Sequence, residues 1–342
     1  MRKRQEIERL QDQILAPQAM RVENSRGRVY PEKEDDFRTA YMRDRDRILH
    51  SKAFRRLKHK TQVFLAPEGD HYRTRLTHTM EVDQIGRTMA RALGLNEDLV
   101  DAIALGHDVG HTPFGHAGEY VLEKLIGPFS HAEQSVRVLS FMEQGSKHHD
   151  YPGLNLTWEV LDGIRNHSGH NRAATVEGRL IKFADRIAYV NHDIDDAIRA
   201  GVLTEEDLPK ECTDILGHSF SARIDCMVRS VIEASDGSSE ILMSEPVWTA
   251  AKKLRAFMYE RVYHNDLVKK ENEKLLKVIE DLFCYYLDQP QAMPESHRRL
   301  YVGELAEASL ERQVADYVAG MTDDYLIHTY RELFIPKAWT KR

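Results

Sequence analysis

The stretch NEDLVDAIALGHDVGHTPFGH at residues 96–116 joins an amphipathic helix to a turn rich in glycine and histidine. Asn96 is a typical helix N-cap, and the apolar residues that follow it have helical spacing. We therefore predict a helix over residues 97–108. The glycines and the proline of the turn end regular structure after it. The adjacent pair His107 and Asp108 is thus placed at a helix C-terminus.

Helical spacing recurs along the rest of the chain, whereas the alternation typical of strands is almost absent. Helices are predicted within residues 1–20, 71–93, 117–126, 131–142, 158–166, 175–199, 205–208, 219–235, 247–264, 267–288 and 303–319. The fold class that follows is all-α. The best candidate linker is SDGSSE at 235–240, but helical periodicity resumes after it. We therefore expect residues 1–342 to form a single domain.

Composition excludes several classes of protein. The 342 residues are 42% hydrophobic and carry a net charge of −7, so the chain is neither disordered nor generally suited to nucleic acid. No apolar stretch approaches the roughly 20 residues of a membrane span, and the basic N-terminus lacks the apolar segment of a signal peptide. The three cysteines are far apart, which excludes a disulfide framework and a thiolate zinc site. We expect a cytoplasmic protein with no membrane partner.

Histidine is unusually frequent. Twelve of the 17 histidines lie between His50 and His170. Histidine is the commonest metal ligand and the usual proton carrier near neutral pH. This region is therefore where a functional site is expected.

Four residues could together hold a metal ion, namely His78, His107, Asp108 and Asp185. Two imidazoles and two carboxylates suit a divalent ion such as Mn, Mg, Fe, Co or Ni. An ion that prefers six ligands would keep places for water and a phosphate oxygen, as metal-assisted hydrolysis requires. A lone histidine or aspartate on a helix is more often a hydrogen-bonded or solvated residue, so the interpretation depends on the four together.

Three further polar residues, His111, His116 and Glu119, follow the His–Asp pair. His116 and Glu119 are three residues apart, so they share a face if a helix begins near His116. A carboxylate beside an imidazole fixes its tautomer and supports its protonated form, so His116 could donate a proton or position water. The alternative is that His111 and His116 only brace the glycine-rich turn.

Cationic side chains lie where they could meet phosphate. Arg75 is three residues before His78 and hence on the same helix face. Arginine suits phosphate because its guanidinium group donates two parallel hydrogen bonds. Further polar residues continue the helix of Asp185, namely Arg186, Tyr189 and Asp193. The basic run at 43–60 is more simply explained as a solvated face or a subunit contact.

These motifs resemble the HD superfamily of metal-dependent phosphohydrolases, with a histidine, an adjacent His–Asp pair and a distant aspartate. Four segments are similar, more specifically, to the deoxynucleoside triphosphate triphosphohydrolase (dGTPase) family: FRRLKHKTQVF (54–64), RTRLTHTMEV (73–82), LGHDVGHTPFGHAGE (105–119) and KFADRIAYVNHDIDDA (182–197). The resemblance extends over about residues 23–335. It implies an HD core over about 71–200, with a helical C-terminal extension over about 201–342.

The resemblance also implies an activity and roles for residues. The activity is metal-dependent hydrolysis of dGTP, or of dNTPs generally, to the deoxynucleoside and inorganic triphosphate. The metal ligands would be His78, His107, Asp108 and Asp185. The catalytic histidine and its acidic partner would be His116 and Glu119, with His111 beside them. Substrate would meet Arg75, Arg186, Tyr189 and His131 at the phosphates, Gln62 and Asp193 at the sugar, and Arg255, Tyr259 and Tyr263 at the sugar and base.

Two other interpretations remain open. The chain could be another HD enzyme, such as a cyclic-nucleotide or alarmone phosphodiesterase, which would share the four metal ligands. It could instead be a nucleotide sensor or a nucleic-acid binder that uses the basic run at 43–60. The dGTPase family commonly forms symmetric hexamers, so a homo-oligomer is expected, whereas nucleic-acid binding is possible but not required.

Overall fold

The computed structural model describes residues 1–62, 73–144, 151–263 and 266–337, and the side chains of 263–272 lie outside that description. Within the described residues the chain is all-α, as predicted, and no β-strand is formed. Two isolated bridges, between Thr61 and Thr74 and between Gln144 and Gly153, are the only β pairings in the described part.

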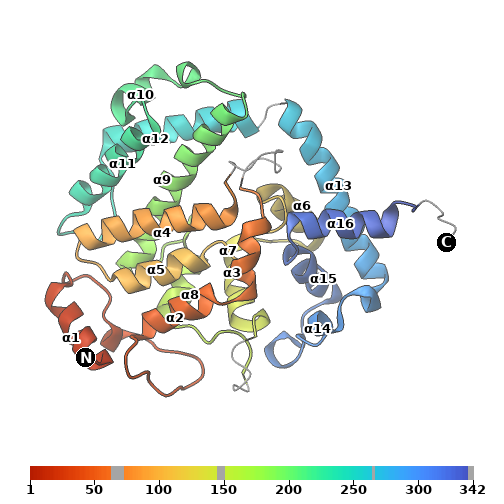
Figure 1. Cartoon of the computed structure of the whole chain (residues 1–342), viewed down its shortest axis with the longest axis horizontal. Helices are drawn as coiled ribbons and strands as arrows, with labels where there is room; N and C mark the ends of the chain where they lie inside the picture. The colour runs from red at the N-terminus through yellow and green to blue at the C-terminus, as the bar shows by residue number, and fades with distance from the viewer. Residues whose placement is uncertain (63–72, 145–150, 264–265, 338–342) are drawn as a thin grey trace.

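The first nine α-helices run from the N-terminus to the middle of the chain (Figure 1). They are α1 (Arg4–Ile14), α2 (Ala40–Leu49), α3 (Lys52–Arg56), α4 (Arg75–Ala92), α5 (Glu97–Gly106), α6 (His116–Ile126), α7 (His131–Arg137), α8 (Trp158–Arg165) and α9 (Val176–Arg199). The remaining helices are α10 (Lys210–Leu216), α11 (Phe220–Ser235), α12 (Glu245–Met258), α13 (Asp266–Asp288), α14 (Glu295–Arg298), α15 (Leu310–Ala319) and α16 (Asp323–Phe334). None of the described helices is both long and apolar enough to cross a membrane.

The central helix α5 is buried on all sides, between α2, α4, α8 and α9. Its apolar residues Leu99, Val100 and Ile103 are fully excluded from solvent. Burying each such side chain contributes about 1.5–3 kcal/mol, so α5 is held rigidly. The C-terminal end of this helix is where the His107–Asp108 pair lies.

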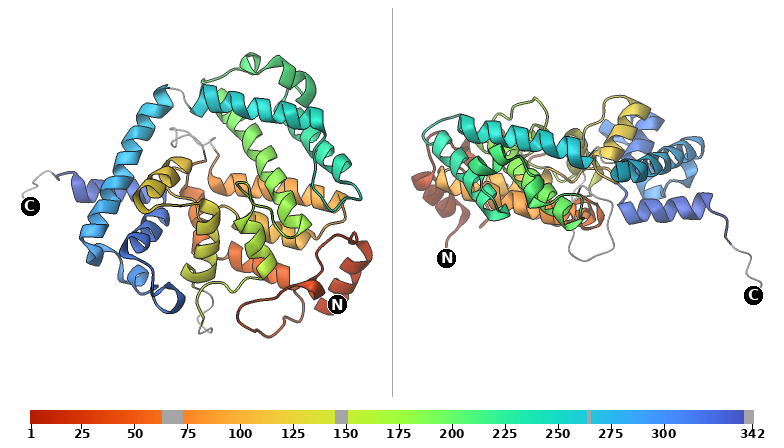
Figure 2. Two further views of the ribbon diagram at one scale, coloured as in Figure 1. Left: turned by 180° about the vertical axis from the view of Figure 1, so that it is seen from behind. Right: turned by 90° about the horizontal axis from the view of Figure 1, so that it is seen from above.

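A second hydrophobic core lies on the other side of the glycine-rich turn. It combines Leu122 of α6 with α13, α15 and Leu326 of α16. Figures 1 and 2 show these C-terminal helices, in blue, standing beside the core of α4, α5 and α9. The turn between α5 and α6 therefore joins the two cores.

Several helix boundaries differ from the prediction. No helix bounds were predicted over the basic run at 43–60, where α2 and α3 lie on either side of Ser51, whose side chain caps α3 by accepting from the amide of Phe54. The helix predicted over 303–319 begins only at Leu310, capped by Ser309. Helix α16 was not predicted, although Thr322 caps it and apolar residues follow at helical spacing.

Candidate metal centre

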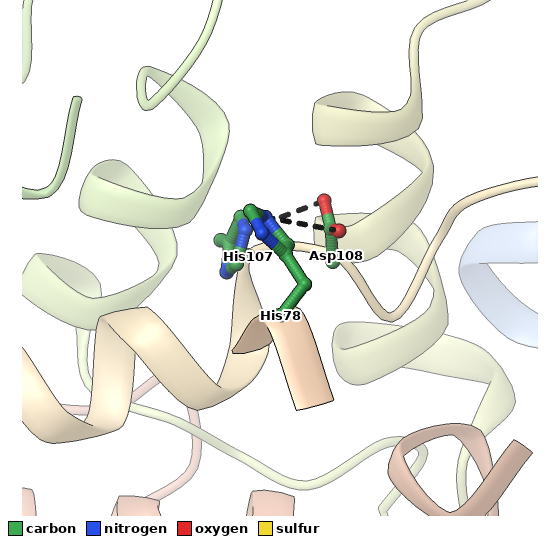
Figure 3. Close-up of side chains that lie close together, drawn as sticks. All are labelled: His78, His107 and Asp108. Atoms are coloured by element: carbon green, nitrogen blue, oxygen red, sulfur yellow. Dashed lines mark ion pairs between the residues drawn. The ribbon is translucent and has the colours of Figure 1, made fainter. Parts of the chain in front are cut away.

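Four side chains from three helices converge on one buried point. In Figure 3 the rings of His78 and His107 face the carboxylate of Asp108, and dashed lines mark the ion pairs. His78 Nε2 lies 3.9 Å from Asp108 Oδ2 and 3.1 Å from Asp185 Oδ1. His107 Nε2 lies 3.4 Å from Asp108 Oδ1 and 3.9 Å from Asp185 Oδ1. The four predicted ligands are thus brought together, His78 from α4, the pair from the end of α5 and Asp185 from α9.

The protonation of His107 is fixed by its own backbone. Its Nδ1 lies 2.6 Å from the carbonyl oxygen of Ala104, which can only accept a hydrogen bond. Nδ1 therefore carries the proton, and the lone pair of Nε2 points into the cluster. That Nε2 is buried and has no hydrogen-bond partner among the described residues. An orphaned imidazole lone pair beside two carboxylates fits a divalent metal ion.

The charges of the cluster support one another. Burial opposes ionisation of Asp185, but its hydrogen bond with His78 and the nearby His107 lower its pKa to about 2. Burial likewise disfavours the charged form of His78, yet Asp185 and Asp108 raise the pKa of His78 overall. Burial also opposes ionisation of Asp108, but the nearby His107, His111 and Arg75 hold its pKa well below the usual range. Both carboxylates are thus ionised at neutral pH, as metal ligation requires.

Arg75 lies against the four clustered side chains rather than free in a pocket. This buried arginine donates from Nη1 to Asp108 Oδ2 at 2.9 Å and from Nη2 to the carbonyl of Gln62 at 3.5 Å. Its Nε is buried without a partner in the described part of the chain. The guanidinium group can therefore add positive charge next to a ligand carboxylate.

A second polar group is formed by His111, His116 and Glu119 together with His131. Glu119 accepts from His116 Nδ1 at 2.9 Å, from the His131 amide at 2.7 Å and from His131 Nδ1 at 3.1 Å. Burial alone would raise the pKa of Glu119, but hydrogen bonds from His116 and His131 hold it well below its usual range. His111 stacks on His131 with ring centroids 4.0 Å apart, and its Nε2 lies 3.3 Å from Asp108. Only the His116 side chain is largely exposed, at 78%.

The turn that carries these residues is fixed by close packing. Gly110 donates to Ser135 Oγ at 2.9 Å, and that hydroxyl donates to the carbonyl of His107 at 2.8 Å. A Cβ atom at Gly110 would collide with the backbone of Ser135. Gly115 has a φ of +59°, and a Cβ there would lie 2.5 Å from Arg75 Nη2. The lack of a side chain at Gly110 therefore lets α7 pack closely on the turn, and the lack of one at Gly115 leaves room for Arg75.

The structure also places the other residues that were predicted to contact substrate. Arg186 stands over the ring of Trp248 at 4.6 Å, and the guanidinium carbon of Arg255 is 5.9 Å from the Tyr189 ring centroid. Other predicted residues are Asp193, buried on α9, Tyr259, exposed after α12, and Gln62, whose Oε1 is buried. Tyr263 lies outside the residues whose side chains are described.

Sequence reasoning missed two buried histidines. His167 Nε2 lies 3.2 Å from His131 Nε2, and its ring packs on the edge of His107 at 4.9 Å. His192 Nδ1 lies 3.5 Å from His78 Nδ1. A signal existed for both, because His167 follows the end of a helix as His107 does, and His192 is seven residues after Asp185 on the same helix.

Lys60 behaves unlike the rest of the basic run. It is buried and donates to the backbone carbonyls of His111 and, at 2.9 Å, of Ala319. Burial lowers its pKa to about 7. Lys60 also lines a cavity of about 490 Å³ behind the turn, together with Arg56, Gly110 and Tyr317. The lysine thus ties the turn to the C-terminal core.

Comparison with known proteins agrees with this geometry. The HD domain family model matches residues 75–190, which contain all four clustered side chains. The family model of the phosphohydrolase-associated domain matches residues 241–332. The crystal structure of a phosphohydrolase from Bacteroides thetaiotaomicron is 21% identical, with a TM-score of 0.51, and covers 84% of this chain and 67% of that one. That likeness concerns the fold.

Curated relatives match nearly the whole chain. A deoxyguanosinetriphosphate triphosphohydrolase-like protein of Caldanaerobacter subterraneus subsp. tengcongensis is 54% identical over 99% of this chain and 98% of its own length. A protein of the same description from Clostridium tetani is 47% identical over 98% and 97%. With the HD match and a His–Asp cluster able to hold a metal, these relatives indicate a metal-dependent HD phosphohydrolase. The chain therefore belongs to the family of deoxyguanosinetriphosphate triphosphohydrolase-like proteins.

Proposed function

We propose that this chain hydrolyses deoxynucleoside triphosphates, dGTP among them, to the deoxynucleoside and inorganic triphosphate. The observation that carries the proposal is the convergence of buried His78, His107 and Asp108 with half-buried Asp185, with the lone pair of His107 Nε2 directed into the cluster. The substrate class is supported by the description of the relatives, which names deoxyguanosine triphosphate.

The four clustered side chains would hold a divalent ion of the Mn, Mg, Fe, Co or Ni type. When bound, the ion supplies positive charge and a Lewis acid for a phosphate oxygen. Arg75 adds a fixed positive charge beside Asp108, at 2.9 Å. Preorganised charge of this kind is the main source of rate in phosphoryl transfer.

The chemical step is attack of water on the α-phosphorus. The water oxygen bonds to that phosphorus, the bond to the 5′ oxygen breaks, and the proton lost by water passes to solvent. His116 would give the 5′ oxygen its proton, since Glu119 accepts from Nδ1 at 2.9 Å and leaves Nε2 free to turn toward substrate. Its 78% exposed side chain can be reprotonated from solvent.

Substrate selection would involve the residues around the four clustered side chains. His111 would stand beside the catalytic pair His116 and Glu119. The residues that would contact phosphate are Arg75, Arg186, Tyr189 and His131, those that would contact the deoxyribose are Gln62 and Asp193, and those that would border the sugar and base are Arg255, Tyr259 and Tyr263. Because Gln62 Oε1 is buried without a partner in the described part, it is available to a sugar hydroxyl.

The test is product analysis with each dNTP in the presence of Mn, Mg or Co. Equal amounts of deoxynucleoside and tripolyphosphate are expected, with no activity after chelation. Release of monophosphate with pyrophosphate, or hydrolysis of cyclic nucleotides alone, would contradict the proposal and favour a different HD reaction. Binding of dNTP without turnover under any of the metals would instead indicate a nucleotide sensor.

A further inference from the structure

Arg186, on α9, differs from Arg73 and Arg75 in the kind of partner that holds it. Arg73 pairs with the carboxylate of Asp195 at 2.7 Å, and Arg75 pairs with that of Asp108 at 2.9 Å. In the described part of the chain, no carboxylate forms an ion pair with Arg186. Its positive charge is therefore not neutralised by an ion pair there.

The ring of Trp248 takes the place of a carboxylate partner. The guanidinium carbon of Arg186 lies 4.6 Å from the centroid of this half-buried ring. Trp248 comes from α12, which packs against α9 (Figure 1). Phe183, one turn before Arg186, also contacts the indole, with ring centroids 5.8 Å apart. An aromatic face attracts a guanidinium group electrostatically, so the indole can fix the arginine without cancelling its charge.

The surroundings of this ring carry an excess of positive charge. Lys252 Nζ lies 5.6 Å from the centroid of Trp248. On α9, burial and the charge of Arg186 lower the pKa of Lys182, one turn earlier. Neither lysine has a carboxylate partner within the described residues. Several cations without carboxylate partners favour an anion at this place.

The same two helices hold a second arginine by a ring. The guanidinium carbon of Arg255, on α12, lies 5.9 Å from the ring centroid of Tyr189, on α9. Arg255 is two turns after Trp248, and Tyr189 is about one turn after Arg186, so each pair shares a helix face. Each helix thus supplies one arginine and one ring. Guanidinium groups held in this way keep their donors for an anion such as a polyphosphate.

We infer that Trp248 is a positioning residue for phosphate binding, because its ring holds Arg186 in the orientation that receives a phosphate oxygen. A carboxylate in the same place would also hold the arginine, but it would cancel the charge that phosphate requires. The inference rests on the proposed function in one respect, that Arg186 contacts phosphate. It gives the phosphohydrolase-associated segment at 241–332, which contains Trp248, a part in binding at the HD segment, which contains Arg186.

A double-mutant cycle tests whether Trp248 acts through Arg186. Inorganic tripolyphosphate would be titrated in a calorimeter, in excess Mg²⁺, into the full-length chain, Trp248→Leu, Arg186→Gln and the double variant. Trp248→Leu alone is expected to weaken binding by about 3–30-fold, the usual range of a cation–π contact. In the Arg186→Gln background the same substitution should weaken binding by less than about twofold, because the contact is already lost.

Two further variants separate the aromatic face from apolar volume and from general stability. Trp248→Phe keeps a ring, so its affinity for tripolyphosphate is expected to lie between those of Trp248→Leu and the parent chain. The matched control is Trp158→Leu, at the start of α8, where the guanidinium carbon of Arg26 lies 3.7 Å from the ring centroid. This control loses a contact of the same kind outside the proposed site and is expected to bind tripolyphosphate as the parent chain does.

Equal weakening by Trp248→Leu in both backgrounds would overturn the inference, because Trp248 would then act through the fold alone. Parent affinity in Trp248→Leu, or no tripolyphosphate binding by the parent chain, would overturn it as well. If Trp248→Leu does not fold, Trp248→Met completes the same cycle. Product analysis with dGTP separates the two proposals. Tripolyphosphate release without coupling in the cycle would overturn only the role of Trp248, whereas coupling with release of monophosphate and pyrophosphate would overturn only the proposed reaction.

Discussion

His107 and His167 use the same local device, a backbone carbonyl three residues earlier that fixes the ring through Nδ1. The proximity of His107 to Asp108 could be predicted because the two are consecutive residues. His167 has the same position after a helix end, but its partner His131 is 36 residues away and meets it only through the packing of α7 on α8, so the pairing could not be predicted. For single residues, the sequence therefore predicts contacts between residues that are close along the chain, whereas contacts between distant residues are known only from the fold.

Replacing His116 tests whether this residue donates a proton or binds the metal ion. His116→Ala is expected to lower turnover by about 10²–10⁴-fold, the usual contribution of general acid–base catalysis. Its side chain is 78% exposed, so the free energy of unfolding should change by no more than about 0.5 kcal/mol. Steady-state kinetics, metal analysis and urea unfolding check the three quantities. Loss of bound metal would make His116 a ligand, and unchanged turnover would reduce it to a brace of the turn.

The two carboxylates proposed as metal ligands, Asp108 and Asp185, are expected to differ in their structural roles. Asp108→Ala and Asp185→Ala should both lose the metal and the activity. Asp108→Ala should also lower the free energy of unfolding of the metal-free chain by about 3–5 kcal/mol, because it leaves buried Arg75 without its partner. Asp185 is 20% exposed and its one hydrogen bond in the described part is with His78, so Asp185→Ala should cost about 1 kcal/mol.

Urea unfolding of the chelated variants measures both costs. Equal destabilisation by the two substitutions would mean that the Arg75–Asp108 ion pair contributes no more to the free energy of unfolding than the Asp185–His78 bond does. Retention of the metal by either variant would contradict the assignment of that carboxylate as a ligand.

At the scale of elements, helix existence was easier to predict than helix ends. The helix over 97–108 was expected from apolar spacing, and α5 forms there as Glu97–Gly106 with Asn96 as its cap. The break at Ser51 and the late start at Leu310 depend on hydroxyl caps, which end or delay a helix where the apolar spacing is still helical. The close contact between the turn and α7 had no signal in the sequence beyond the glycines themselves.

That contact makes Gly110 a position where a methyl group cannot be accommodated. Gly110→Ala is expected to lower the free energy of unfolding by about 3 kcal/mol or more, because its Cβ would meet the backbone of Ser135 rather than a movable side chain. The matched control is Gly86→Ala in α4, where the nearest atoms are side-chain ends at 3.1 and 3.3 Å. The control should change stability by less than about 1 kcal/mol, since alanine favours the helix. Equal effects in urea unfolding would show that the turn is not tightly packed against α7.

At the scale of the whole molecule, the C-terminal core holds the turn of the metal centre in place. Asp323, at the start of α16, accepts from the amide of Phe114 at 3.0 Å and from Thr61 N and Oγ1 at 2.8 and 2.7 Å. Phe114 has a φ of 60°, which is unusual for a residue other than glycine. A strained turn therefore depends on a residue more than 200 positions later, which sequence spacing does not reveal.

Asp323→Ala is therefore expected to damage activity and stability together. Removing the carboxylate leaves two amides unpaired, which should cost roughly 2–4 kcal/mol in the free energy of unfolding. Turnover should fall as well, because His111 and His116 flank the released turn. Asp324→Ala is the matched control, since its side chain is 89% exposed and should change neither quantity appreciably. Normal turnover in a destabilised Asp323→Ala would mean that the C-terminal core supports the fold without positioning the centre.

The central claim is that water attacks the α-phosphorus of a deoxynucleoside triphosphate at the His–Asp cluster. Hydrolysis of dGTP in oxygen-18 water, followed by mass spectrometry of the products, tests it most directly. The account predicts one labelled oxygen in the released tripolyphosphate and none in deoxyguanosine, with no product in Asp185→Ala. Label in orthophosphate, in pyrophosphate or in deoxyguanosine would place the attack at another atom and contradict the account.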